Sequence, residues 1–280
     1  MREEIYQLYQ KCFPDISVLP STFSERFEND ECYLLTYQEK KRLLAFSLVE
    51  KNSILLLCVD PAFQGKGIGT KMLSKTEQVI RQNGYDTIQL GFGNRYLYPG
   101  VPTNLPNSSV SFFEHFGYNA TKERVDMTMN LDEFTFSKLS LPIPEHPSFY
   151  SYATEQDWIE LEGAIASVNP KWSHPLKNST GRILIVKLQG KIAGFAQVKT
   201  GGKETIFSRA KELGYIDYVG VLPEYRKLGL GRRLVAYGTK ELQRLKCEMA
   251  YIGSTELEKW YERIGYKTYL RFWMGHKKLL

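Results

Sequence analysis

The 280-residue sequence lacks several features that would assign a protein to a class at once. Its four cysteines are scattered and form no C-x-x-C pair, which argues against a structural zinc site and for free thiols in a reducing compartment. No apolar run approaches the roughly 20 residues that a membrane span needs, and the N-terminus lacks the apolar core of a signal peptide. We therefore expect a cytoplasmic protein that has no membrane partner and no metal.

A strong charge of either sign is also missing. The net charge of +6 suits a small polyanionic ligand but is too diffuse to predict nucleic-acid binding.

An apolar fraction of 42 % is sufficient for well-formed cores. The length fits two domains of roughly 130–140 residues each.

Two stretches of the chain share one sequence pattern, which predicts an apolar strand, then a glycine-rich turn and then an amphipathic helix. They span 54–69 and 215–231, and aligning Gln64 with Arg226 places Gly67 on Gly229 and Gly69 on Gly231. Such a turn directs backbone N–H groups and a helix N-terminus at one point, which favours an anion such as a phosphate. A single turn of this kind would more often be a plain tight turn, but two in register predict a duplicated phosphate site.

Two nucleotide-binding motifs are excluded by the spacing of these turns. Neither contains G-x-x-x-x-G-K-[ST], so no side chain is placed for Mg²⁺ as in a P-loop. Neither fits G-x-G-x-x-G in a βαβ context, which a dinucleotide site requires. A phosphate bound at these turns would therefore belong to a ligand other than those recognised by P-loop and dinucleotide sites.

The pattern of elements repeats around a proline-containing segment at 136–148, which we expect to be an extended linker. We expect domains at 1–135 and 149–280, each an α/β unit with a mixed sheet flanked by helices. The first half is expected to contain helices at 3–12 and 22–28, strands at 32–37, 43–50 and 54–59, a helix at 69–81, a strand at 87–91, a helix at 109–116 and a strand at 125–130. The second half is expected to contain a strand at 149–152, a helix at 154–166, strands at 182–188, 191–199 and from 215, a helix at 231–246, a strand at 250–253, a helix at 255–264 and a strand at 268–274.

Both turns match [QR]-x-x-G-x-[GA], and each follows a strand that ends in V-x-P. The segment 261–266 further matches Y-x-x-x-G-[FY] on a short helix. In this order the motifs resemble the GNAT superfamily of N-acetyltransferases, and the resemblance covers nearly the whole chain as a tandem of two GNAT-like domains with mostly antiparallel mixed sheets.

The resemblance implies that the ligand is acetyl-CoA or another acyl-CoA, used as a co-substrate without a metal. It implies pairing of the pantetheine arm with the main chain near Val219 to Val221 and binding of the pyrophosphate by amides of the second turn. The expected cofactor-binding residues of the second half are Val219, Val221, Arg226, Lys227, Leu228, Gly229, Leu230, Gly231, Arg232 and Ser254. A second, weaker set in the first half is Val59, Gln64, Gly65, Lys66, Gly67, Ile68, Gly69 and Thr70.

The two halves differ in the residues that could move protons. Tyr261 stands where the family places the general acid for the departing thiolate, and Asp217 lies on the strand before the turn, where it could take the amine proton directly or through water. The first half has Phe113 at the position of Tyr261 and no acid or base on its strand 54–58. The second half is therefore predicted to be catalytic. The rival interpretations are that Tyr261 is a core residue and that Asp217 is a salt-bridge partner or an edge-strand charge.

Taken together, the sequence predicts an N-acyltransferase that moves an acetyl group from acetyl-CoA to a primary amine by direct transfer. The acceptor is a small molecule or a peptide: a metabolite, an aminoglycoside-like drug, a polyamine, and a protein N-terminus or lysine all remain open. No nucleic-acid partner is expected. The alternative is a non-catalytic acyl-CoA-binding or interaction protein built from degenerate acetyltransferase domains.

Overall fold

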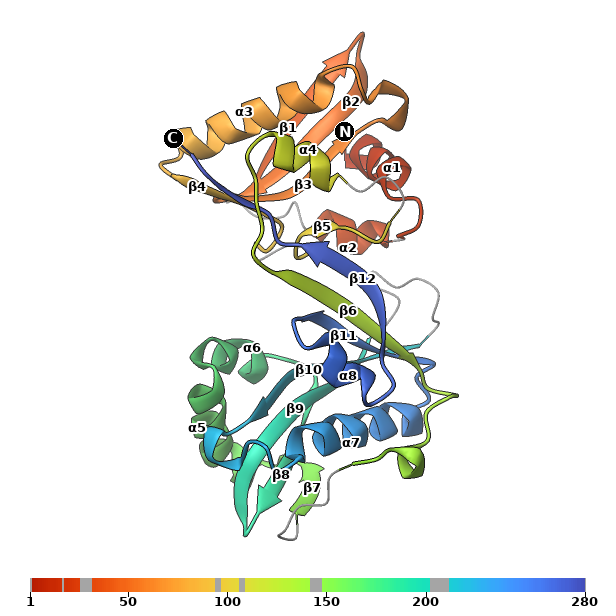
Figure 1. Ribbon diagram of the computed structural model, residues 1–280, viewed down its shortest axis with the longest axis vertical. Helices are drawn as coiled ribbons and strands as arrows, with labels where there is room; N and C mark the ends of the chain where they lie inside the picture. Colours follow the sequence, from red (N-terminus) through yellow and green to blue (C-terminus); the bar gives the residue numbers. More distant parts are fainter. Residues whose placement is uncertain are drawn as a thin grey trace. The chain divides into compact units, whose positions relative to one another are not determined.

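The computed structural model describes residues 2–16, 18–25, 32–93, 97–105, 109–141, 148–201 and 212–279 (Figure 1). Contacts divide them into two compact units. Unit 1 contains the described residues of 1–125 and 270–280, and unit 2 contains those of 126–203 and 210–269. Each unit is described by itself.

Unit 1 is built on a five-stranded sheet with helices packed on it. Its strands follow the order β1-β2-β3-β4-β13, and all neighbours are antiparallel except β3 and β4. Helix α3 packs against the first three strands, and α1 packs against β2 and β3. The elements are α1 (Arg2–Cys12), α2 (Pro20–Ser24), β1 (Cys32–Glu39), β2 (Arg42–Glu50), β3 (Ser53–Val59), α3 (Ile68–Gln82), β4 (Thr87–Leu90), β5 (Val101–Pro102), α4 (Val110–His115) and β13 (His276–Lys278).

Unit 2 has a larger sheet with the same kind of central strands. Within the unit its strands follow the order β12-β6-β11-β10-β9-β8-β7. Helix α7 packs against β8, β9 and β10, and α5 packs against β9 and β10. The elements are β6 (Glu123–Asn130), β7 (Ser148–Tyr152), α5 (Trp158–Val168), α6 (Ser173–Lys177), β8 (Arg182–Leu188), β9 (Lys191–Gly201), β10 (Leu213–Val221), α7 (Leu230–Arg244), β11 (Met249–Thr255), α8 (Glu258–Glu262) and β12 (Lys267–Trp273).

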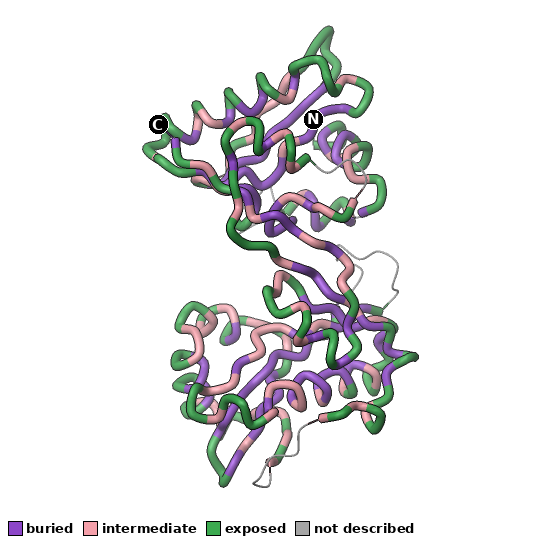
Figure 2. Tube along the Cα trace, in the orientation of Figure 1, coloured by how far each residue is buried: buried purple, intermediate pink, exposed green. Residues whose placement is uncertain are grey.

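The central strands are apolar along nearly their whole length because both faces of the sheet are covered. In β2 every residue after Arg42 is buried, and β3 is buried except at Leu57. Strand β9 is likewise buried from Ile192 to Val198 (Figure 2). These strands give each unit its own core, onto which the apolar stripe of the helix after the glycine turn packs.

Each unit also contains a strand from the other half of the sequence. Strand β6 lies between β11 and β12 in unit 2, and from Asp126 onward it belongs to that unit. Strand β13, at the end of the chain, pairs with β4 in unit 1, where the Lys277 Nζ lies 2.9 Å from the carboxylate of Glu77. The domain boundaries at 135 and 149 stay a prediction, since these compact units cross them.

The predicted fold class is confirmed: two mostly antiparallel mixed sheets are flanked by helices, and the strand–turn–helix segments lie where the sequence places them. The helix predicted at 255–264 is shorter, Glu258–Glu262, and the short strands β5 and β13 were not predicted. The start of the predicted extended linker is instead a 3₁₀ turn, Phe136–Lys138, because Phe136 packs on Tyr237 with ring centroids 4.8 Å apart.

Some predictions fall outside the described residues. They are linker residues 142–147 and residues 26–28 of the helix predicted at 22–28. Among the residues that are described, no helix has both the length and the apolar character needed to cross a membrane.

Candidate functional site

The second glycine turn forms the floor of a cavity in unit 2. Gly229 is the N-cap of α7 and adopts a left-handed conformation, with φ of 78°, and Lys227 is also left-handed, with φ of 66°. The first helical hydrogen bond of α7 runs from the Arg233 N–H to the Gly229 carbonyl, so the preceding amides of the helix have no helical partner. They open on a cavity of about 440 Å³, lined by Val168, Val219, Gly220, Val221, Tyr225, Arg226, Lys227, Gly229, Leu230, Gly231, Arg232, Leu257, Trp260, Tyr261 and Arg263.

Positive charge gathers at this cavity. Arg226 and Lys227 are exposed, and Arg232 and Arg263 also line it. The Nε–H of Arg226 donates to the Val221 carbonyl at 3.1 Å, so part of this side chain holds the turn in place. Free helix amides together with four cationic side chains fit a pyrophosphate. The sequence motif did not predict Arg263, which follows the short helix α8.

An opening between two strands leads into the same cavity. The parallel ladder between β10 and β11 ends at the pair Tyr215 and Tyr251, although β10 continues to Val221. Beyond that pair, β10 is bulged: its register against β9 shifts between Asp217 and Gly220. Val219 and Val221, predicted to pair with the pantetheine arm, both line the cavity on this open edge.

Tyr261 on α8 reaches the cavity from the other side. The residue is 5 % exposed, and its hydroxyl has no hydrogen-bond partner among the described residues. Burial and the negative charge of Asp217 raise the pKa of Tyr261, so the phenol stays protonated at neutral pH. A neutral, unpaired hydroxyl is what a proton donor requires, whereas a structural tyrosine would be tied to a carbonyl.

The negative charge of Asp217 on β10 acts on Tyr261, although Asp217 itself is not among the residues that line the cavity. Burial raises the pKa of the Asp217 carboxyl to about 6; the nearby charge of Lys199 opposes this shift, and that of Asp126 adds to it. A carboxylate with this pKa is ionised at neutral pH and more basic than an exposed aspartate. Its environment therefore suits a general base.

Asp126 is a member of this region that sequence reasoning missed. It is 3 % exposed on β6, and its carboxylate accepts hydrogen bonds from the Tyr251 hydroxyl and, at 2.6 Å, from the Ser254 N–H. Ser254, predicted to bind the cofactor, thus uses its amide inside the protein. Burial raises the pKa of Asp126 to about 6. The signal that could have identified Asp126 is its position in the strand: an aspartate that is buried and has apolar residues on either side.

The first glycine turn has almost the same backbone as the second. Gly67 caps α3 with φ of 77°, Gly65 has φ of 73°, and Gln64 donates from Nε2 to the Val59 carbonyl at 3.1 Å, as Arg226 does to Val221. Gln64 therefore makes the hydrogen bond in the first turn that Arg226 makes in the second turn, but it carries no positive charge.

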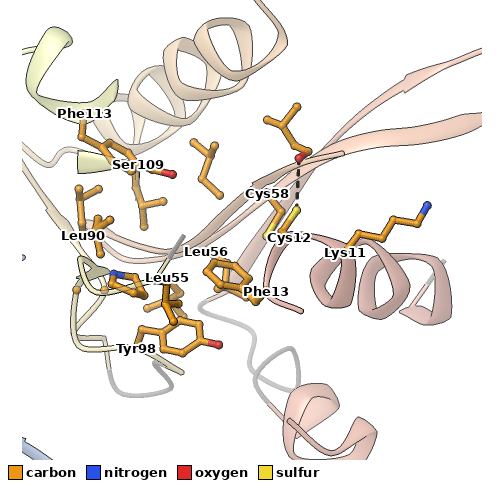
Figure 3. A pocket seen from close by; sticks show the side chains of 18 of the residues that line it. Lys11, Cys12, Phe13, Leu55, Leu56, Cys58, Leu90, Tyr98, Ser109 and Phe113 are labelled. Atoms are coloured by element: carbon orange, nitrogen blue, oxygen red, sulfur yellow. Dashed lines mark hydrogen bonds between the residues drawn. The ribbon is translucent and has the colours of Figure 1, made fainter. Parts of the chain in front are cut away.

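Beside this first turn lies a cavity of about 290 Å³ in unit 1, lined largely by apolar residues of β3 and by Tyr98, Ser109 and Phe113. Figure 3 shows Phe113, from α4, at its wall, where unit 2 has Tyr261. Cys12 and Cys58 lie beside each other at the same cavity (Figure 3). The Cys12 thiol donates to the Val59 carbonyl at 3.4 Å and also interacts with the Cys58 thiol. Strand β3 contains no carboxylate, so unit 1 has a similar turn without counterparts of Tyr261 and Asp217.

The remaining candidate groups contribute less. His115 on α4 and His174 on α6 are both exposed. The four cysteines are free thiols. Within the described part of the chain, no group of three or more His, Cys, Asp or Glu side chains is arranged to hold a metal ion.

Comparisons with known proteins agree with this geometry. The sequence model of the Acetyltransferase (GNAT) family matches residues 2–118 and 140–266. A mycothiol acetyltransferase of Paenarthrobacter aurescens (strain TC1) is 22 % identical in an alignment of length 213, which covers 69 % of this chain and 59 % of that protein.

Two solved structures have a similar fold. The glucosamine N-acetyltransferase region of a fungal multi-domain GH3 β-N-acetylglucosaminidase superposes with a TM-score of 0.82 at 19 % identity, covering 99 % of this chain and 37 % of that one. A tandem GNAT protein from the clavulanic acid biosynthesis pathway superposes with a TM-score of 0.69 at 12 % identity, covering 99 % and 94 %. At these identities the structures support the fold and the tandem arrangement.

Proposed function

The chain belongs to the GNAT acetyltransferase family, and from this premise we propose that unit 2 transfers an acetyl group directly from acetyl-CoA to a primary amine. The observation that carries the proposal is the cavity on the glycine turn, which Tyr261 of α8 lines together with the turn's amides and cations. Tyr261 is a neutral donor, and Asp217, an ionised acceptor on β10, acts on it through its charge.

In this proposal the cavity holds acetyl-CoA by its two polar parts. The N-terminal amides of α7 and the cations Arg226, Lys227 and Arg232 bind the pyrophosphate, and the open edge of β10 from Val219 to Val221 pairs with the pantetheine arm. Glycine suits position 231 because a Cβ added at Gly231 would lie 3.2 Å from the Trp260 ring, which is a tight contact. Binding in this direction leads the thioester toward Tyr261.

The chemistry moves two protons off the acceptor's nitrogen. Asp217 takes the first from the acceptor's ammonium, directly or through water, and the freed amine nitrogen attacks the thioester carbon. As the C–N bond forms and the C–S bond breaks, Tyr261 gives its proton to the departing CoA thiolate, and the Tyr261 phenolate recovers a proton from the nitrogen of the new amide, directly or through water. Asp217 then releases its proton to solvent. A base with a pKa of about 6 is anionic at pH 7 and still accepts a proton in a transient step.

Unit 1 is proposed to be non-catalytic. Phe113 cannot donate a proton where Tyr261 can, and the buried strand β3 offers no base. Its glycine turn, with Lys66 beside it, keeps the main features of an acyl-CoA site, so occupancy without turnover is expected.

The acceptor is proposed to be a small-molecule or peptide amine. The name of one similar protein, a glucosamine N-acetyltransferase region, makes amino sugars the first acceptors to test. The second candidate function, a non-catalytic acyl-CoA-binding protein, is favoured by the degenerate site of unit 1.

The deciding experiment measures CoA thiol release from acetyl-CoA with a panel of amino sugars, amino alcohols, polyamines and peptides. We expect turnover with at least one amine, loss of that turnover in Tyr261→Phe and Asp217→Asn, and retention in Tyr237→Phe. Tyr237 is the matched control because it lies in the same unit and stacks on Tyr150 away from the cavity. Acetyl-CoA binding without thiol release for every amine would instead support the binding protein.

A further inference from the structure

We propose that Gln197 and Asp217 form the acceptor subsite of unit 2, with Asp126 as its positioning residue, and that this subsite takes an amine carrying one ammonium group and a neutral hydroxyl oxygen close to it. The inference rests on the proposed acetyl transfer and specifies the acceptor that the transfer uses. The subsite should favour amino alcohols and amino sugars over simple alkylamines and polyamines.

The two contact residues share one face of the sheet. Asp217 on β10 is paired in register with Gln197 on β9, so their side chains project to the same side. The opposite face packs on α7, because a Cβ at Gly238 of that helix would contact Ile216 and Val198. Cβ atoms of directly paired residues lie about 4.5–5.5 Å apart. A carboxylate and an amide therefore stand side by side on the face away from α7.

Gln197 carries an unused donor on this face. Its side chain is 3 % exposed, and its Nε2 has no hydrogen-bond partner among the described residues. The chain makes room for this amide, since a Cβ at Gly181 would lie 2.8 Å from the Gln197 Cδ. A buried amide without a partner is costly, and such groups are typical of sites that bind a polar ligand group. A hydroxyl oxygen of the acceptor would satisfy the donor.

Asp126 acts on the subsite through Asp217. The Tyr251 hydroxyl and the Ser254 N–H fix its carboxylate on β6, and Tyr251 is paired with Tyr215, two residues before Asp217 on the same face. Its negative charge is felt at Asp217, so the two carboxylates together attract an ammonium group. The acceptor's ammonium thus meets Asp217, and Asp126 sets the charge and basicity of that contact.

Lys199 limits the charge of the acceptor. It is exposed on the same face of β9, opposite Tyr215, and its charge also reaches Asp217. A second ammonium group would be repelled by this lysine. The described titratable groups that act on Asp217 or respond to it are Lys199, Asp126, Tyr218 and Tyr261.

The first test compares two acceptors of similar size, 2-aminoethanol and propylamine, which differ by a hydroxyl in place of a methyl group. We expect wild-type kcat/KM to favour 2-aminoethanol by at least tenfold and the preference to fall to about one in Gln197→Leu. Gln156→Leu, a change at an exposed glutamine of the same unit, should keep the wild-type ratio. An unchanged ratio in Gln197→Leu would overturn the subsite.

The second test concerns Asp126 and uses a pH profile. Because the Asp126 charge raises the pKa of Asp217, Asp126→Asn should move the acidic limb of kcat/KM to lower pH, and Asp126→Glu should restore it. A purely structural role would lower activity at every pH without moving the limb. An unmoved limb in a folded Asp126→Asn protein overturns the positioning role, and the Asp126→Glu profile provides the same comparison if the asparagine variant does not fold.

These outcomes separate the subsite from the proposed function. If wild-type protein releases no thiol with any amine, the transferase proposal fails. If it turns over both probe amines but shows no dependence on Gln197, the transferase stands and the subsite fails.

Discussion

Substituting glutamate for the capping glycine of each turn decides which unit carries the activity. Gly67 and Gly229 have nearly equal left-handed φ angles of 77° and 78°, so a residue with a side chain suffers similar backbone strain at both positions, about 1–2 kcal/mol. The two variants are therefore matched in backbone strain. At Gly67 no protein atom lies within 4 Å of an added Cβ, so a larger side chain meets no clash.

The effect on ligand binding differs because the added carboxylate stands at a proposed pyrophosphate site. Two unit charges roughly 4 Å apart interact by about 4 kcal/mol at an effective dielectric near 20. Repulsion of that size weakens acetyl-CoA binding roughly 10³-fold. In Gly229→Glu this loss falls on the unit that holds Tyr261 and Asp217, so turnover should be abolished at ordinary acetyl-CoA concentrations. In Gly67→Glu most activity should remain.

The assay combines urea denaturation, calorimetric titration with acetyl-CoA, and thiol release. Denaturation should give similar midpoints for the two variants, which shows that both are folded to the same extent. Unchanged acetyl-CoA affinity in folded Gly229→Glu would refute the assignment of the cavity. If Gly67→Glu is inactive while Gly229→Glu keeps its activity, the active site lies in unit 1 and not in unit 2.

Tyr261→Phe should leave acetyl-CoA affinity nearly unchanged and lower kcat by about 10²–10⁴-fold, the usual effect of losing a positioned proton donor; a kcat within a factor of two of wild type would make Tyr261 a core residue. Burial raises the pKa of Asp217 to about 6, so the basic form is lost as the pH falls through this value, and kcat/KM measured from pH 5 to 8 should decline below about pH 6, a limb that Asp217→Asn should lack. The hydrogen bond with Cys58 lowers the pKa of Cys12 while burial raises that of Cys58, so limited iodoacetamide treatment followed by peptide mass spectrometry should find Cys12 modified first, and faster labelling of Cys58 would contradict this. Fragments 1–135 and 149–280 should be poorly soluble when expressed apart, because the first lacks β13 and the second lacks β6, and their co-expression should restore a folded protein measured by circular dichroism.

Local chemistry explains what the sequence could predict. The left-handed conformation of Gly67 and Gly229 is dictated by glycine itself, and the apolar stripe after each turn requires a helix that packs on a sheet. The same motifs singled out Tyr261 and Asp217, and in the structure the charge of Asp217 acts on Tyr261. The roles assigned to these residues remain predictions.

Other features depend on contacts that no local pattern encodes. The three residues of β13 are too short and too polar to be recognised as a strand, and only their pairing with β4 makes them one. Gln197 lies within an otherwise apolar run, where a single polar residue gives no sign of its position relative to Asp217. Arg226 was interpreted as a ligand-binding cation, and its bond to the Val221 carbonyl became visible only in the folded turn.

The exchange of strands gives the first half of the sequence a role in unit 2 that does not depend on its own glycine turn. Strand β6 carries Asp126 to a position between β11 and β12, where its carboxylate is bonded to residues of β11. The charge that this residue adds near Asp217 is absent from the sequence of the second half alone. The absence of counterparts of Tyr261 and Asp217 from unit 1 is therefore compatible with a contribution of the first half to the site, because the region around the proposed base is assembled from both halves of the chain.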